Sequence, residues 1–250
     1  MGQKKKKKGM AKGSAPTLGV ALMEYNNLTA DYGQFSPTDR VGLGSDCVGS
    51  IECPASWPFD TVYAVARGGG PRETLAGADS AVEGITRAVH RLESDADLVI
   101  ANCGFFWCGW KSLRGGTQTP VLLSGLDFLD LALSATAGSV GVLTYSKPCV
   151  EALLHDHSGI RRMRIVGFSD LPSWKAIEEP DCFGVGGWTE ESLREEFLIR
   201  LKTELNDGSL KDVRALVIEC VGMPKWRSDI RKLTNVPVFD LMSITKSLLA

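Results

Sequence analysis

With 250 residues, of which 44% are hydrophobic and 23% charged, the chain has an ordinary globular composition, which excludes a wholly disordered protein. No apolar run reaches the roughly 18 residues that a membrane-spanning helix needs, so we expect no integral membrane association. The net charge is −2, but residues 1–13 hold six lysines and no acidic residue. The remaining 22 basic and 30 acidic residues give the rest of the chain a charge of −8. An acidic body of this kind argues against nucleic acid as a partner.

The lysine-rich start has no apolar stretch behind it, so it does not resemble a secretory signal. We expect residues 1–15 to form a basic disordered tail and the protein to be cytoplasmic; a nuclear-localisation or anionic-surface patch is the alternative for the tail. The seven cysteines should then be mostly reduced. Because no second Cys/His pair stands at zinc spacing, we expect no metal site.

Short apolar runs alternate with segments of helical periodicity along the rest of the chain. Residues 25–60 interrupt this pattern with a stretch rich in Gly, Ser, Asp and Pro, whose length indicates a functional loop or lid. Thr189 is placed to cap the helix that follows it. In chain order, the predicted elements are strands at 17–23 and 61–66, a helix at 73–93, strands at 97–101 and 120–124, a helix at 126–137, a strand at 140–144, a helix at 149–155, a strand at 164–168, a helix at 190–205, strands at 214–219 and 237–240, and a helix from 241. This alternation predicts an α/β fold with mostly parallel sheets.

Two of the predicted strands, one in each half of the chain, end on a cysteine followed closely by glycine. Residues 97–104 end on Asn-Cys-Gly, and residues 213–222 end on Glu-Cys-Val-Gly. Ligands of open parallel sheets lie beyond the carboxyl ends of the strands, where both Cys103 and Cys220 are expected. The turns after them can present backbone N–H groups to an anion, and a helix that began there would lower the thiol pKa.

Two such thiols on opposite sides of one carbon can act as general base and general acid, and so invert a stereocentre by proton transfer. The alternative is inert packing, since cysteine is among the residue types most often buried. The matched positions of Cys103 and Cys220 in two similar halves favour the catalytic interpretation.

Several motifs carry a resemblance to the aspartate/glutamate/hydantoin racemase superfamily. Asn102-Cys103-Gly104-Phe105 resembles the Ser-Cys-Gly-Phe signature of a poorly characterised branch, and residues 49–59 resemble an early-loop motif of that branch. Thr119-Pro120-Val121 with Ser124 is similar to the family's Thr-Pro-Val…Ser pattern. The other segments that look like the family are residues 18–22, 140–144, 218–224 and 236–240, so the likeness runs from about residue 17 to the C-terminus.

The resemblance implies two pseudo-symmetric α/β/α domains with the active site in the cleft between them. The expected first lobe comprises residues 16–120 plus 236–250, and the second comprises residues 121–235. The family works without a cofactor, acts on small-molecule carboxylates and is commonly homodimeric. It implies Cys103 and Cys220 as the catalytic pair. The expected substrate-binding residues are Ser50, Ser56, Gly104, Phe105, Ser124, Thr144, Val221 and Gly222.

The chain also departs from the family pattern. Gly104 and Val221 stand where family racemases have Thr or Asn, and Ser50 and Cys53 replace the Asp and Asn of the early loop. Aspartate and glutamate are therefore poor candidate substrates. Aromatic residues instead indicate a more apolar or aromatic substrate, unless they fill the core or a dimer interface: Trp57, Phe105, Phe106, Trp107, Trp110 and Trp226.

The leading functional prediction is a cofactor-independent racemase or epimerase that inverts a stereocentre next to a carboxylate. A decarboxylase or a cis-trans isomerase of the same superfamily is the enzymatic alternative. A two-lobed ligand-binding protein that has kept the fold and lost the chemistry is the alternative from another class.

Overall fold

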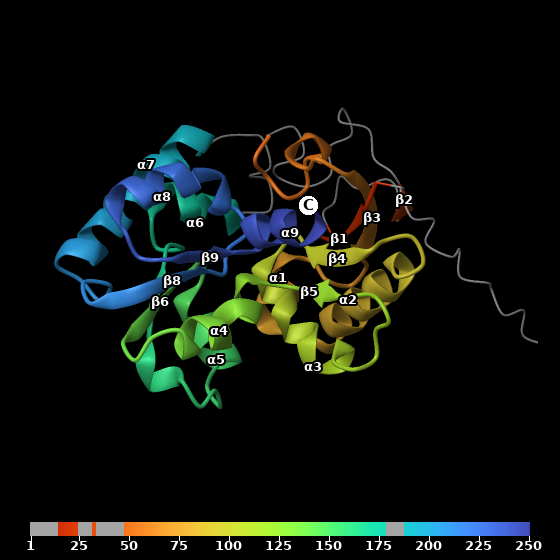
Figure 1. The fold of residues 1–250 in the computed structure, drawn as a ribbon, viewed down its shortest axis with the longest axis horizontal. Helices are drawn as coiled ribbons and strands as arrows, with labels where there is room; N and C mark the ends of the chain where they lie inside the picture. Colours follow the sequence, from red (N-terminus) through yellow and green to blue (C-terminus); the bar gives the residue numbers. More distant parts are fainter. Residues whose placement is uncertain (1–14, 25–31, 34–47, 179–187) are drawn as a thin grey trace, which may run out of the picture.

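The computed structural model describes residues 15–24, 32–33, 48–178 and 188–250 of the chain. Nearly all of the predicted basic tail, residues 1–14, lies outside these residues, as does most of the loop predicted at 25–60. The described strands form two sheets, one in each of two lobes (Figure 1). The predicted α/β architecture with mostly parallel sheets is confirmed.

The sheet of the first lobe has the strand order β2-β3-β1-β4-β5. Its pairings are parallel except for the short β2, which runs antiparallel to β3. The inner strands are buried on both faces, as is typical of parallel sheets covered on both sides. Its strands are β1 (Thr17–Met23), β2 (Tyr32–Gly33), β3 (Asp60–Ala66), β4 (Leu98–Ala101) and β5 (Val121–Leu122).

The sheet of the second lobe has the order β7-β6-β8-β9, with all pairings parallel. This order repeats the order β3-β1-β4-β5 of the first sheet, so β4 and β8 occupy equivalent positions. The two lobes are therefore pseudo-symmetric, as expected. The strands are β6 (Ser139–Thr144), β7 (Met163–Gly167), β8 (Val213–Ile218) and β9 (Val238–Asp240).

Helices cover the faces of both sheets, and in Figure 1 the second sheet lies between α4 and α5 on one side and α6, α7 and α8 on the other. Among the helices of the described residues, none is long and apolar enough to cross a membrane. The helices are α1 (Pro71–Ala76), α2 (Asp79–Leu92), α3 (Trp110–Leu113), α4 (Leu129–Ser134), α5 (Lys147–Leu153), α6 (Pro172–Lys175), α7 (Glu190–Asn206), α8 (Arg227–Leu233) and α9 (Leu241–Leu249).

Local chemistry explains where several helices begin and end. The helix predicted at 73–93 is divided into α1 and α2, because Gly77 adopts a left-handed conformation (φ 62°) that ends α1. The predicted cap of α7 is present, since the Thr189 side chain accepts a hydrogen bond from the Ser192 backbone N–H at 3.0 Å.

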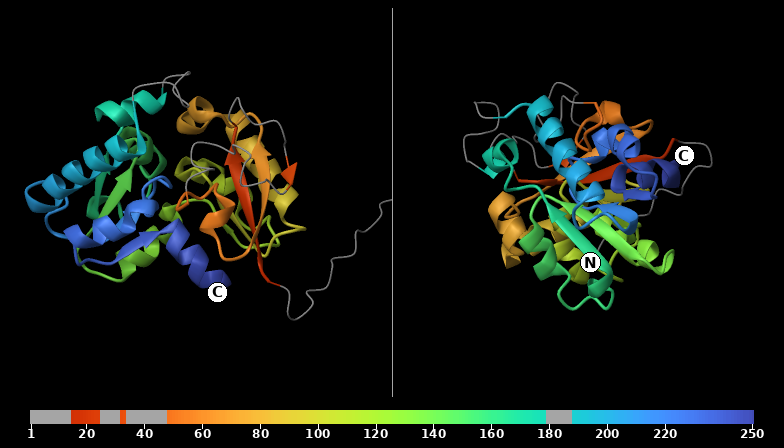
Figure 2. Two further views of the ribbon diagram at one scale, coloured as in Figure 1. Left: turned by 90° about the horizontal axis from the view of Figure 1, so that it is seen from above. Right: turned by 90° about the vertical axis from the view of Figure 1, so that its left-hand side faces the viewer.

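The expected boundaries between the lobes need two corrections. β5 pairs with β4, so residues 121–122 belong to the first sheet, whereas the expected second lobe began at 121. β9 pairs with β8, so the C-terminal strand extends the second sheet, whereas residues 236–250 were expected in the first lobe. Helix α9 does join the first lobe, because Leu241 and Met242 pack in its core. Figure 2 shows α9 at the junction of the two lobes.

Candidate active site

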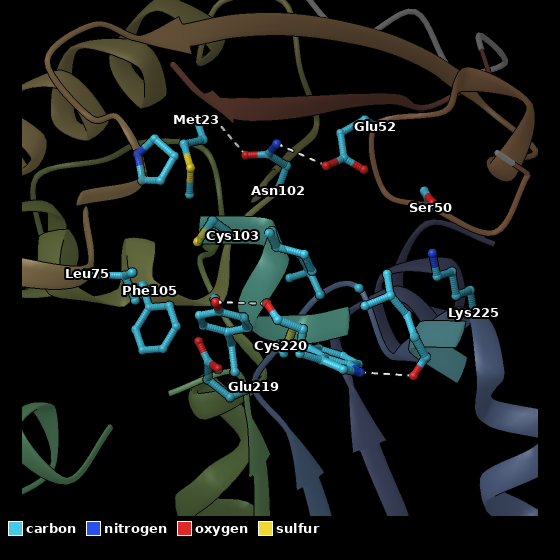
Figure 3. Close-up of a pocket in the computed structure, with 18 of the residues that line it drawn as sticks. Met23, Ser50, Glu52, Leu75, Asn102, Cys103, Phe105, Glu219, Cys220 and Lys225 are labelled. Atoms are coloured by element: carbon cyan, nitrogen blue, oxygen red, sulfur yellow. Dashed lines mark hydrogen bonds between the residues drawn. The ribbon is translucent and has the colours of Figure 1, made fainter. Parts of the chain in front are cut away.

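A cavity of about 210 Å³ lies between the lobes and is lined by residues from both (Figure 3). Two strand-end segments, Asn102–Phe105 after β4 and Glu219–Gly222 after β8, contribute to its lining. Because β4 and β8 are equivalent strands, the pseudo-symmetry of the fold brings these segments together from distant parts of the sequence.

Cys103 and Cys220 stand at equivalent places in the two lobes. Each is the second residue beyond its strand, and both side chains line the cavity. The two thiols are close enough for a charge on one to raise the pKa of the other. The structure therefore brings the two cysteines to one cavity, while their catalytic role remains a proposal.

The residue before each cysteine is anchored in the same way. The backbone N–H of Asn102 donates to Ala21 of β1 at 3.0 Å, and the Asn102 side chain accepts from the N–H of Met23 at 2.7 Å. In the second lobe, the N–H of Glu219 donates to Leu143 of β6 at 2.9 Å, and the Glu219 carboxylate accepts from the N–H of Tyr145. A side chain that bonds back to the central strand holds each cysteine segment in place.

Glu219 is a completely buried carboxylate next to both thiols. Its Oε2 accepts a hydrogen bond from the Thr144 hydroxyl at 2.6 Å, whereas its Oε1 has no partner among the described residues. Burial raises the pKa of Glu219 to about 7, and the bonds from Thr144 and Tyr145 oppose this only in part.

The surroundings of both thiols favour the neutral form. Burial raises the pKa of Cys103 well above its ordinary value and that of Cys220 to about 12, and the negative charge of Glu219 adds to both effects. Backbone N–H groups of Phe105 and Gly222 favour the respective thiolates but are outweighed. The turns after the cysteines therefore act in the direction that lowers the thiol pKa, but burial and the charge of Glu219 outweigh them and the net pKa of each thiol is raised.

Gly104 is a point of close approach between the two strand-end segments. A Cβ on this residue would lie 2.1 Å from the backbone oxygen of Glu219 and 2.2 Å from its Oε1. The Glu219 carboxylate therefore occupies the space that a side chain after Cys103 would need. This explains why glycine stands at a position where the resemblance led us to expect Thr or Asn.

A second buried carboxylate lines the cavity on the side of the first lobe. Glu52 accepts a hydrogen bond from the Asn102 side-chain amide at 3.1 Å, and burial raises its pKa (Figure 3). Lys225 also lines the cavity and forms an ion pair with Glu190 at the start of α7. In Figure 3, Lys225 and Ser50 lie near each other, while Glu219 lies closer to Phe105.

The structure brings together five of the eight expected substrate-binding residues and leaves three outside the cavity lining. The three are polar residues with structural partners: Ser56 accepts from the Gly49 N–H at 2.8 Å, Ser124 accepts from the Leu126 N–H at 3.2 Å, and Thr144 holds Glu219. The five that line the cavity are Ser50, Gly104, Phe105, Val221 and Gly222.

The aromatic lining is different from the one expected. Of the six aromatic residues singled out in the sequence, Phe105 alone lines the cavity, whereas Phe106 is buried in the first core and Trp226 in the second. The aromatic wall is formed by Tyr145, Trp174 and Trp188. These come from separate loops and α6, and no periodicity in the sequence marks them.

Sequence reasoning also missed the acidic and basic lining residues. Glu219 carried a usable signal, because a glutamate directly after a strand of otherwise buried apolar residues has to be paired or functional. Asn102 carried the same signal in the first half. Glu52 lies in a turn, Glu190 at the start of α7 and Lys225 in a short 3₁₀ helix, and charged residues are ordinary at all three places.

No family model matches the chain. Among the curated proteins, dimethylsulfoniopropionate lyase 6 of Emiliania huxleyi (strain CCMP1516) is 25% identical over 248 residues, which cover 94% of this chain and 59% of the relative. Dimethylsulfoniopropionate lyase 7 of the same strain is also 25% identical over 248 residues, which cover 94% of this chain and 67% of the relative. The chain thus spans about three fifths to two thirds of the length of these relatives.

Solved structures with the same fold include racemases and a decarboxylase. An allantoin racemase from Klebsiella pneumoniae has a TM-score of 0.60 at 17% identity, covering 94% of this chain and 86% of its own. The aspartate racemase of Picrophilus torridus has a TM-score of 0.50 at 16% identity, with coverages of 94% and 93%. A cysteine-substituted mutant of arylmalonate decarboxylase in a sulfate-associated form has a TM-score of 0.50 at 15% identity, with coverages of 90% and 87%. The chain therefore has the fold of these racemases and of arylmalonate decarboxylase, which is the fold that the resemblance of its sequence motifs implied.

Proposed function

We propose that the protein is a cofactor-independent lyase, in which a cysteine removes a proton from the carbon next to a substrate carboxylate and the neighbouring carbon then loses its leaving group. The observation that carries this proposal is that Cys103 and Cys220 line one cavity beside Glu219. The names of the curated relatives favour a lyase that acts on dimethylsulfoniopropionate or a similar carboxylate.

The reaction is a β-elimination, which needs no reactant besides the substrate and the cysteine base. A cysteine thiolate takes a proton from C2 of dimethylsulfoniopropionate, and the C–H electron pair becomes the C2–C3 double bond. The C3–S electron pair leaves with sulfur, so the products are acrylate and dimethyl sulfide. The protonated thiol then returns its proton to solvent, which restores the base.

Cys220 is the better candidate for the base. The positive charge of Lys225 and the backbone N–H of Gly222 both favour its thiolate, whereas a charge on Cys220 disfavours the thiolate of Cys103. Lys225, with Ser50 beside it, is the group we assign to the substrate carboxylate, since Lys225 is the one positively charged residue in the described lining of the cavity.

Racemisation or epimerisation is the second candidate, favoured by the equivalent positions of the two cysteines in the pseudo-symmetric lobes. Here the first step is the same, but the other thiol returns a proton to the opposite face of the carbon.

A homodimer in the cytoplasm completes the proposal, and light scattering of the purified protein tests the dimer.

The test supplies dimethylsulfoniopropionate to the protein and measures dimethyl sulfide in the headspace. We expect release by the wild type and a loss of about 100-fold or more in Cys220→Ser, because a general base contributes about that much. Cys103→Ser should keep a measurable rate, since elimination needs one base. Cys108→Ser is the matched control, because Cys108 is also partly buried but is not part of the cavity lining.

A different pattern would favour another function. Solvent deuterium that enters the stereocentre of a chiral carboxylate, with inversion abolished by either cysteine substitution, would select the racemase. Carbon dioxide release would select a decarboxylase, and turnover of an alkene without a stereocentre would select a cis-trans isomerase. Ligand binding without turnover of any of these would select the binding protein.

A further inference from the structure

One oxygen of the Glu219 carboxylate is left for a ligand. Oε2 is satisfied by Thr144, but Oε1 is completely buried and has no hydrogen-bond partner among the described residues. A buried carboxylate oxygen without a partner is costly, because it has lost its hydration and gained nothing in return. Since Glu219 lines the cavity, the missing partner can come from a molecule bound there.

Among the residues that the structure describes, no positively charged side chain is shown to neutralise Glu219. Lys225 is the positively charged residue among the described residues that line the cavity, and it is already paired with Glu190. The thiols of Cys103 and Cys220 are also near Glu219, but burial and the charge of Glu219 keep both protonated. Glu52, which lines the same cavity, is a second carboxylate and adds no positive charge. The described surroundings of Glu219 therefore lack an unpaired positive charge.

Aromatic rings that line the same cavity are suited to bind a positively charged group that has no hydrogen-bond donors. Tyr145 and Trp174 lie with their ring centres 6.3 Å apart, and Trp188 lines the same cavity. The faces of aromatic rings carry partial negative charge and attract sulfonium and quaternary ammonium groups. A buried carboxylate combined with such rings is more favourable for an onium group than for a neutral alkyl group of the same size.

We infer, on the basis of the proposed function, that Glu219, Tyr145, Trp174 and Trp188 form a subsite for the positively charged head of the substrate. Glu219 is the residue that selects carboxylates bearing an onium group over carboxylates of the same shape that lack this charge. The onium group supplies the electrostatic partner that Oε1 lacks.

The same contact links binding to chemistry. Burial and the charge of Glu219 both disfavour the two thiolates, so the cysteines are poor bases. A bound onium group offsets that charge and makes the thiolate easier to form when the substrate is in place. The base is then activated by the substrate it acts on.

Two unreactive ligands of nearly identical shape test this subsite in the purified chain by calorimetric titration. One is 3-(trimethylammonio)propionate, a zwitterion, and the other is 4,4-dimethylpentanoate, which has a tert-butyl group in place of the cation. We expect the wild type to bind the zwitterion about tenfold or more tightly than its neutral-headed counterpart. In Glu219→Gln this preference should disappear. Glu52→Gln is the matched control that should retain it, because the Glu52 carboxylate already accepts from Asn102.

Equal or weaker binding of the zwitterion by the wild type would overturn the inference. This comparison needs no substitution, so the inference can be tested even if a Glu219 variant fails to fold. A preference that survived in Glu219→Gln would also overturn it. Because neither ligand needs to react, the proposed lyase activity can fail while the preference for the onium ligand stands, and the two outcomes are distinguishable.

Discussion

Glu219 connects the acid–base chemistry of the site to its burial. A carboxylate with no exposure, one satisfied oxygen and a pKa of about 7 is poised between its charged and neutral forms near neutrality. Its charge is a cause of the raised pKa of both cysteines. Changes at this one residue should therefore be visible at Cys103 and at Cys220.

Glu219→Gln should lower the pKa of both thiols, because it removes a neighbouring negative charge and keeps a side chain of similar size. Ultraviolet absorbance of the thiolates is followed during alkaline titration, and comparison of the protein with and without Cys103→Ser or Cys220→Ser gives the contribution of each site thiol by difference. Cys108 is the internal reference. Burial raises its pKa to about 11, and Glu219 does not contribute to that shift. Unchanged titration of the two site cysteines would contradict the assigned coupling.

Glu219 should also make the folded state less stable as the pH rises from 4.5 to 7. The folded protein keeps the proton over this range, because the pKa is raised from 4.5 to about 7, whereas the unfolded chain has already lost it. The difference corresponds to about 3 kcal/mol of unfolding free energy. Urea titrations at both ends of the range should show this loss in the wild type and a smaller one in Glu219→Gln. Some loss should remain, because Glu52 also has a raised pKa.

At the scale of elements, the segments that follow β4 and β8 approach each other so closely that a residue in one of them must lack a side chain. Gly104 meets this need on the first-lobe side. Gly125 plays a similar part beside β8, because a Cβ there would lie 1.9 Å from the backbone oxygen of Ile218. Close backbone approach rather than turn geometry explains both glycines, since neither has a positive φ.

Gly104→Ala should lower the unfolding free energy by about 1–3 kcal/mol and displace the Glu219 carboxylate, because the new methyl group overlaps it. Gly116→Ala provides the control, since its Cβ would meet nothing nearer than 3.6 Å. Chemical denaturation measures both variants. Gly104→Ala should in addition abolish the preference for the onium ligand, and equal stability of the two variants would contradict the clash.

At the scale of the whole molecule, the C-terminal segment ties the two lobes together. β9 completes the second sheet, and α9 packs its apolar side chains into the core of the first lobe. Asp240 lies at the junction: it is completely buried, caps α9 by accepting from the Ser243 N–H at 2.8 Å and pairs with Arg227 of α8. This segment therefore connects the second sheet to the core of the first lobe, and the cavity lies between the two parts that it connects.

Arg227→Ala should lower the unfolding free energy by about 3 kcal/mol, since it leaves the buried Asp240 carboxylate without its ion-pair partner. Lys232→Ala, at an exposed position of the same helix, should change it by less than about 0.5 kcal/mol. Thermal unfolding followed by tryptophan fluorescence reports both lobes, because tryptophans lie in each core. A loss in Arg227→Ala no larger than in the control would show that the pair does not stabilise the junction.

Most of the fold was predictable from local patterns in the sequence. The apolar run at 17–23 coincides with β1, and the strands ending before Cys103 and Cys220 lie within a residue or two of their predicted bounds. The cap at Thr189 was predictable because capping depends on a few neighbouring residues. The division of helix 73–93 at Gly77 was missed, because an isolated glycine is compatible with a continuous helix.

By itself the sequence determined the alternation of strands and helices, the two cysteines at equivalent strand ends and the resemblance to the racemase fold, because these depend on periodicity and short motifs. Only the tertiary structure decided that Glu219 enters the space beside Gly104, that Tyr145, Trp174 and Trp188 form the aromatic wall, and that the thiols are held neutral. These features arise where the two lobes meet. Proximity across 75 residues or more, as between Thr144 and Glu219, and the dielectric surroundings it creates are properties of the packed molecule.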